Sequence, residues 1–111
     1  MVSNIVRFDA IRTAPEGSIT ASYTPLGIPF AHAMRVLHFI NNTDGDMMIS
    51  FDGITDNTAV LADSFNLYDL TSDQDHNESF RYENRTQIWI RYISAPTIGN
   101  FYLVAIYGKG E

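Results

Sequence analysis

The sequence predicts an all-β fold, an antiparallel β-sandwich or a β-barrel, from two observations. First, short segments rich in Ile, Val, Tyr and Phe follow one another along the chain, most of them separated by turns containing Pro, Gly, Asn or Asp. These residues suit a pleated, half-buried surface, and about eight such short strands are typical of a sandwich or barrel. Second, no window sustains an apolar period of 3.6 residues, so no helix is expected. No linker or repeat divides residues 1–111, which are predicted to form one domain.

The N-terminal third contains the weaker strand signals. Residues 4–13 alternate in polarity and predict a first strand, a turn follows at Pro15-Glu16-Gly17, and residues 18–24 predict a second, weaker strand. Residues 25–30 (PLGIPF) carry two prolines and a glycine, so they cannot form a regular central strand. Two interpretations of this loop stay open. It is either a contact loop or arm that presents three apolar side chains to a neighbour, or a cover for the core of its own domain. Those side chains are Leu26, Ile28 and Phe30.

The middle of the chain predicts a β-hairpin. Residues 34–41 (MRVLHFIN) form a strong strand signal, and the pair Asp44-Gly45 that follows is a strong hairpin-turn signal. Residues 46–52 (DMMISFD) are therefore expected to pair with residues 34–41. Two further short strands are predicted at residues 58–62 and 64–70, before a polar, acidic surface loop at residues 71–79.

The strongest strand signals lie in residues 86–107, where two runs flank a break containing Ser94, Pro96, Gly99 and Asn100. Both runs are apolar on both faces. Alternate residues of a strand point to opposite faces of the sheet, so one face is expected to meet the core and the other face to meet another surface.

Composition restricts the classes of partner. The chain has a formal net charge of −6 and a sequence pI near 4.8, and its seven Lys and Arg residues are scattered. Such a chain has no global attraction for nucleic acid or anionic lipid, so neither is an expected partner. It has no cysteine, and no apolar run approaches the ~20 residues that span a bilayer. The N-terminus lacks the pattern of a signal peptide, so a soluble protein made in a cytoplasm is expected.

No catalytic signature is present. The chain has no Cys nucleophile, no G-x-S-x-G elbow, no P-loop and no dinucleotide fingerprint, so we expect no enzyme, no cofactor and no small-molecule substrate. Two acidic groups, one in the turns and one in the polar loop, could bind a metal ion, but neither matches an EF-hand loop and solvated turn residues are favoured. The first group comprises Asp44, Asp46, Asp52 and Asp56, and the second comprises Asp73, Asp75, His76 and Glu78.

Aromatic residues allow two interpretations. They could form a stacking platform for a sugar, or they could serve as core and subunit-interface anchors, which is the favoured interpretation. His38 alternates with Val36 and Ile40, which favours a satisfied or interface histidine over a metal ligand. The aromatic residues concerned are Trp89, Tyr92, Tyr102 and Tyr107.

Residues 37–107 resemble small virion proteins of tailed bacteriophages. Among these, the chain is most similar to the capsid decoration proteins, also called cement or staple proteins, of short-tailed phages of the epsilon-fifteen type. The features that carry the resemblance occur in order: Asn41-Asn42 after an apolar strand, residues 49–57 (ISFDGITDN), residues 68–71 (YDLT), residues 86–92 (TQIWIRY), Ser94-Ala95-Pro96 and residues 102–107 (YLVAIY).

The resemblance implies a jelly-roll-like β-sandwich that sits as a homodimer on the outer capsid surface of a virion and bridges neighbouring major capsid (coat) subunits. We therefore expect a non-enzymatic structural protein whose partners are the coat protein and a second copy of itself. The expected contact residues are Trp89, Arg91, Tyr102 and Tyr107, with residues 25–30 as the arm. Three alternatives remain: a tail, collar or adaptor component, a small carbohydrate-binding module, and a calcium-dependent module.

Overall fold

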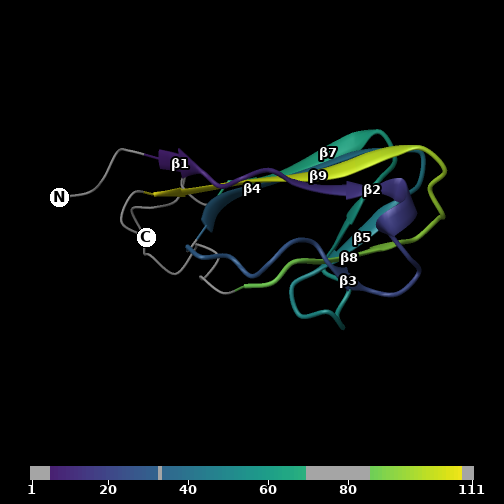
Figure 1. The fold of residues 1–111 in the computed structure, drawn as a ribbon, viewed down its shortest axis with the longest axis horizontal. Helices are drawn as coiled ribbons and strands as arrows, with labels where there is room; N and C mark the ends of the chain where they lie inside the picture. The colour runs from purple at the N-terminus through teal and green to yellow at the C-terminus, as the bar shows by residue number, and fades with distance from the viewer. Residues whose placement is uncertain (1–5, 33, 70–85, 109–111) are drawn as a thin grey trace.

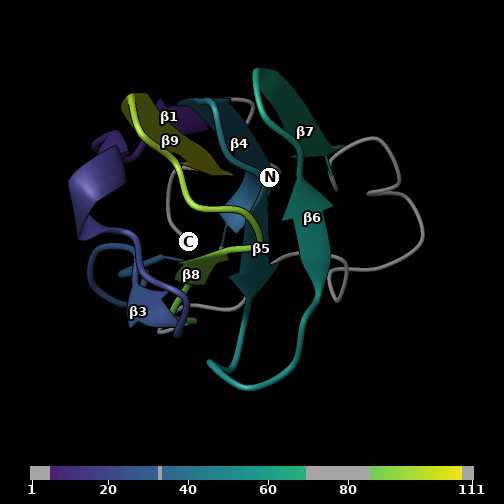
Figure 2. The same cartoon turned by 90° about the vertical axis from the view of Figure 1, so that its right-hand side faces the viewer.

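The structure is a computed structural model that describes residues 6–32, 34–69 and 86–108. Within these residues nine strands form two antiparallel sheets, and the only helical element is the single 3-10 turn η1 (Glu16–Ser18). Figures 1 and 2 show the sheets as two stacked layers. Sheet A contains β1 (Val6–Phe8), β2 (Arg12–Pro15), β4 (Met34–Thr43), β7 (Ser64–Asp69) and β9 (Gly99–Gly108), and sheet B contains β3 (Thr24–Pro25), β5 (Met47–Ser50), β6 (Thr58–Val60) and β8 (Trp89–Tyr92).

The strand pairing is nested. β2 pairs with β9, β3 with β8, β4 with β7 and β5 with β6. Three further pairings, β1 with β9, β4 with β9 and β5 with β8, complete the sheet orders β1-β9-β4-β7 and β3-β8-β5-β6. A ribbon of nested antiparallel pairs that rolls into two packed sheets is a jelly roll. The predicted all-β sandwich is confirmed, and its topology is jelly-roll-like.

The core lies between the two sheets. Alternate residues of the long strands β4 and β9 point inward, and side chains of β5, β6 and β8 meet them from sheet B. No helix of the described residues has the length and apolarity that crossing a bilayer requires. The fully buried side chains include Leu37, Phe39, Met47, Ile49, Val60, Ile88, Phe101 and Leu103.

The predicted hairpin between residues 34–41 and 46–52 is wrong. β4 belongs to sheet A and β5 to sheet B, so the turn at Asp44-Gly45 crosses between the sheets. Glycine is required there for close approach, since a Cβ on Gly45 would lie 2.3 Å from the carbonyl oxygen of Ser94. The dipeptide has the composition of a hairpin turn, but here it connects two strands that belong to different sheets.

The N-terminal strand is interrupted by a β-bulge. Phe8 faces Ile106 and Arg12 faces Leu103, so the N-terminal segment has one more residue than β9 between these two pairs. An extra residue reverses the alternation, and Arg12 therefore points inward whereas Phe8 points outward. The expected turn at residues 15–17 overlaps η1, and the expected strand at residues 18–24 is formed only at its end, in β3.

Residues 25–30 cover the domain's own core. Leu26 is 2% exposed and Phe30 is 1% exposed, so the arm interpretation is wrong for both, and only Ile28, at 74%, lies on the surface. The backbone N–H of Leu26 donates to the carbonyl of Ile88 (2.7 Å), which extends the contact between β3 and β8.

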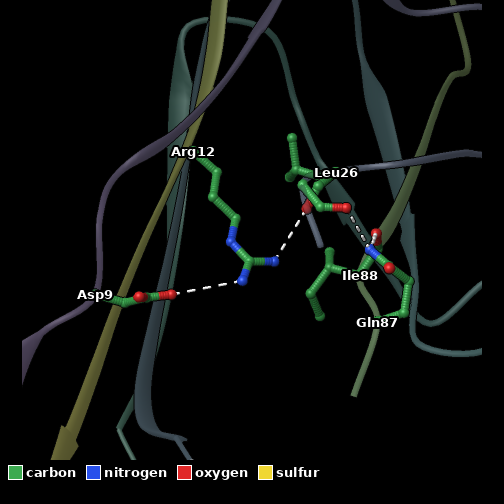
Figure 3. A network of polar contacts seen from close by, with 6 residues as sticks. Asp9, Arg12, Leu26, Gln87 and Ile88 are labelled. Atoms are coloured by element: carbon green, nitrogen blue, oxygen red, sulfur yellow. Dashed lines mark hydrogen bonds and ion pairs between the residues drawn. The ribbon is translucent and has the colours of Figure 1, made fainter. Parts of the chain in front are cut away.

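Arg12 connects this loop to sheet A (Figure 3). Its Nη1 donates to the carbonyl of Leu26 (3.1 Å), its Nη2 lies 3.5 Å from an Asp9 carboxylate oxygen, and its guanidinium lies 4.4 Å from the centre of the Phe30 ring. Burial lowers the pKa of Arg12, and Asp9 opposes that effect. On the other side of the loop, the Gln87 amide donates to the carbonyl of Gly27 (3.0 Å).

Candidate functional site: the outer face of sheet A

The most distinctive surface is the side of sheet A that points away from sheet B. The strand registers place its residues in three neighbouring rows: the first contains Val36 and Ile106, the second His38 and Val104, and the third Ile40 and Tyr102. Strands β1, β2 and β7 extend these rows at both edges. We define the outer face of sheet A as Phe8, Thr13, Val36, His38, Ile40, Phe65, Leu67, Tyr102, Val104 and Ile106.

The outer face of sheet A is apolar and open. Phe8 is 68% exposed, Phe65 62% and Leu67 54%, while the aliphatic residues of β4 and β9 are half-buried by their neighbours. In Figures 1 and 2 no described segment crosses this side of the sheet. Its exposed area is about 500 Å² if each aromatic side chain presents ~150–250 Å² when fully accessible. That is near the upper end of the largest apolar patch of a typical monomer, a class of patch that is often functional.

Charge is absent from the middle of the face. None of the residues that define it is Lys, Arg, Asp or Glu, and the nearest charged residue in its rows is Asp69, which lies opposite Val36 on the edge strand β7. By contrast, the chain as a whole has a net charge of −6. The outer face is therefore a neutral, apolar area on an acidic protein.

His38 lies in the middle row of the face. Its ring packs edge-on against Phe65, with ring centres 5.2 Å apart and an interplanar angle of 77°. Its Nε2 atom is buried and has no hydrogen-bond partner among the described residues. Buried polar atoms nearly always have a hydrogen-bond partner, so this atom is an exception within the packing of the described residues. The sequence favoured a satisfied or an interface histidine; Nε2 is not satisfied among the described residues, and the interface role stays a prediction.

The contact residues predicted from the resemblance do not form one surface. Tyr102 lies on the outer face of sheet A. Trp89 and Arg91 point away from the core on the other side of the molecule, since Ile90 between them faces inward. Tyr107 packs against the core and stacks on His32, with ring centres 3.9 Å apart.

Trp89 is covered by a neighbouring turn. Gly53 has a φ of +81°, and a Cβ placed on it would lie 3.0 Å from the indole ring, so the turn rests directly on that ring. Tyr92 packs against the core, as Tyr107 does. The four aromatic residues of the sugar-platform interpretation therefore lie on different surfaces.

Three of the acidic turn residues close turns and loops. Asp52 accepts the N–H groups of Thr55 (2.7 Å) and Ile54 (2.8 Å), and these hydrogen bonds hold its pKa far below the usual range. Asp44 accepts the N–H of Thr97 (2.6 Å), and hydrogen bonds from Thr97 lower its pKa. Asp46 accepts the N–H of Ala62 (2.9 Å).

Asp56 holds a small cluster on the outer side of sheet B. It accepts a hydrogen bond from the hydroxyl of Tyr23 and pairs with Arg91 at 3.0 Å, and both interactions lower its pKa. The described residues contain no group of three side chains able to hold a metal ion. Four residues of the second predicted acidic group lie outside the described residues, namely Asp73, Asp75, His76 and Glu78.

One pocket lies at the edge of the sandwich. It has a volume of about 200 Å³ and is lined by Phe51, Asn57, Thr58 and Tyr68. Pockets for drug-sized ligands are usually ~300–1,000 Å³, so this one is small for a substrate. Among the described residues, the outer face of sheet A is therefore the stronger candidate site.

Sequence reasoning missed part of this face. A strand was predicted at residues 64–70 without assigning its faces, although Phe65 and Leu67 alternate there with Ser64 and Asn66 and alternate residues point to opposite faces. The usual arrangement would place the apolar pair toward the core. The polar pair instead lies toward sheet B, where the amide of Asn66 donates to the carbonyl of Ala59 (2.8 Å).

Comparisons with protein-family models, with curated proteins and with solved structures found no match to this chain.

Proposed function

We propose that the protein is a non-enzymatic virion component that decorates the outer surface of a bacteriophage capsid. It acts as a homodimer and stabilises the shell by bridging neighbouring coat subunits. The observation that carries this proposal is the open, uncharged outer face of sheet A, which suits a protein surface better than a soluble substrate. The jelly-roll topology supports it as an analogy, because capsid and lectin domains both use this fold.

Bridging needs at least two kinds of contact. One of them joins two copies of the chain. The other joins the dimer to the coat protein, through the negative charge of the chain and through exposed apolar side chains on loops, such as Ile28 (74% exposed) and Ile54 (84%). Negative charge keeps free subunits soluble and steers them to basic patches of a shell. A dimer that engages several coat subunits at once gains avidity from contacts that are individually weak.

The test is co-sedimentation of the purified protein with shells of the phage that encodes it, stripped of this component. We expect saturable binding at a copy number comparable with that of the coat protein, together with greater resistance of the shell to heat. Saturation at only the few copies that fit at a single tail vertex would contradict the decoration role and support the tail, collar or adaptor role. No binding, combined with saturable quenching of Trp89 fluorescence by a glycan, would replace it by a carbohydrate-binding role.

A further inference from the structure

We propose that the outer face of sheet A is the surface through which two copies of the chain associate, with sheet A of one copy packed against sheet A of the other. This inference rests on the proposed function only for the statement that the protein is a homodimer. It adds which face of the sheet forms the contact and which residue lies at the centre of that contact.

Charge favours a second copy as the occupant. Two molecules that each carry a net charge of −6 repel one another, and the repulsion is smallest when their uncharged surfaces meet. The outer face of sheet A is such a surface, because Asp69 at the edge is the only charged residue that the described strands place in its rows. A partner recognised by charge would find no complementary group in the middle of the face. A second copy presents an equally neutral, equally apolar face.

The size of the face agrees with a weak dimer. Two faces of about 500 Å² would bury about 1,000 Å² in total, slightly below the ~1,200 Å² at which specific stable interfaces begin. Sheets packed face to face lie about 10 Å apart with their strands inclined by roughly 30°, which lets side chains of two twisted sheets interdigitate. We therefore expect a dimer that dissociates on dilution and is strengthened when many copies are held on one shell.

Symmetry places His38 at the centre. A two-fold contact is self-complementary, and residues near its axis meet their own copies. His38 lies in the middle row of the face on β4, one of the two central strands of sheet A. A two-fold axis through the middle of the face thus brings the two His38 residues close to one another.

The test uses two leucines of nearly equal exposure. Leu67 (54% exposed) lies on the outer face of sheet A, whereas Leu61 (57%) lies outside it. In sedimentation equilibrium on the purified full chain, Leu67→Glu should raise the dimer dissociation constant by about tenfold or more, because it would bury an unpaired carboxylate. Leu61→Glu should leave the constant unchanged. A wild-type chain that stays monomeric at every concentration, or equal effects of the two variants, would overturn the proposal.

A second measurement tests whether His38 lies near the two-fold axis of the dimer. The chain has no cysteine, so His38→Cys introduces a single thiol. Mild oxidation should convert this variant to a disulfide-linked dimer much faster than Leu61→Cys, and equal rates would refute the central position of His38. These readouts need no capsid. If the chain is a monomer that binds shells, the dimer interface is refuted and the decoration role is supported. If the chain forms the dimer but does not bind shells, the decoration role is refuted and the interface is supported.

Discussion

Replacing Phe30 with alanine tests whether residues 25–30 cover the core of their own domain or form a contact arm. In the structure the Phe30 side chain is 1% exposed, its backbone N–H donates to the carbonyl of Thr86 (3.0 Å), and its ring lies under the guanidinium of Arg12. Phe30→Ala leaves the backbone bond in place and removes the ring. The resulting loss of stability therefore reports the packing of that ring between the sheets.

The magnitude follows from the burial. Truncation of a buried Phe to Ala costs about 3–5 kcal/mol, from lost transfer free energy and from the cavity that remains. Loss of the cation–π contact with Arg12 adds ~0.5–1 kcal/mol. A domain of this size has a total stability of ~5–15 kcal/mol, so the variant would lose a large fraction of it. With an m value of ~1–3 kcal/mol/M, the urea midpoint should fall by roughly 2 M.

The assay is equilibrium unfolding in urea, followed by fluorescence of Trp89, the only tryptophan in the chain. Ile28→Ala is the matched control in the same loop. It removes an apolar side chain that is 74% exposed, so it should change the free energy of unfolding by less than ~0.5 kcal/mol. If Phe30→Ala were as stable as Ile28→Ala, the burial of this loop would be refuted and the arm interpretation restored.

Three further predictions concern turns and buried polar groups. Asn41→Leu should cost ~2–4 kcal/mol in thermal unfolding, because it removes the amide donor to the carbonyls of Gly45 (2.8 Å) and Val60 (2.9 Å); an unchanged melting temperature would contradict this network. Gly53→Ala should destabilise the fold by ~1–3 kcal/mol and red-shift tryptophan emission, since positive φ and the overlying indole both exclude a Cβ; unchanged emission would show that the turn does not cover the ring. The pKa of Asp52 is lower in the folded state than in the unfolded state. Its contribution to the free energy of unfolding should therefore be complete above about pH 5 and be lost as the pH falls below ~4. Asp52→Asn should flatten that acid limb of the stability curve, and an identical limb would contradict the capping role.

The strands were predictable from sequence because alternation is a local property. Residues 34–41 and 101–107 carry their polarity pattern within a few positions, and both fall within the long strands of sheet A. The apolar character of both faces of residues 101–107 also predicted that one face would meet the core and the other face another surface. The second face of β9 lies on the outer face of sheet A, and its contact with another surface stays a prediction.

Which segments of the chain pack against one another was not predictable, because these contacts join residues far apart in the sequence. Asp44-Gly45 has the composition of a hairpin turn, yet its carboxylate caps Thr97 and its glycine packs on Ser94. The inward position of Arg12 depends on one extra residue in a bulge, which no period-2 pattern reveals. The burial of Phe30 likewise depends on Arg12 and on Thr86, residues that sequence reading does not connect to a Pro-rich loop.

The nested pairing of the strands has a consequence for biosynthesis. β9, the last strand of the described residues, lies between β4 and the strands β1 and β2, so sheet A stays open until β9 has left the ribosome. The innermost pair, β5 with β6, can form earliest, and the outermost pairs, β1 and β2 with β9, must close last, after all the other strands have been made. Long-range closure of this kind makes folding slow, and until it occurs core side chains such as Phe39, which packs against Phe101 of β9, stay exposed to solvent. Chains that lack β9 should therefore aggregate or be degraded rather than accumulate as partial subunits.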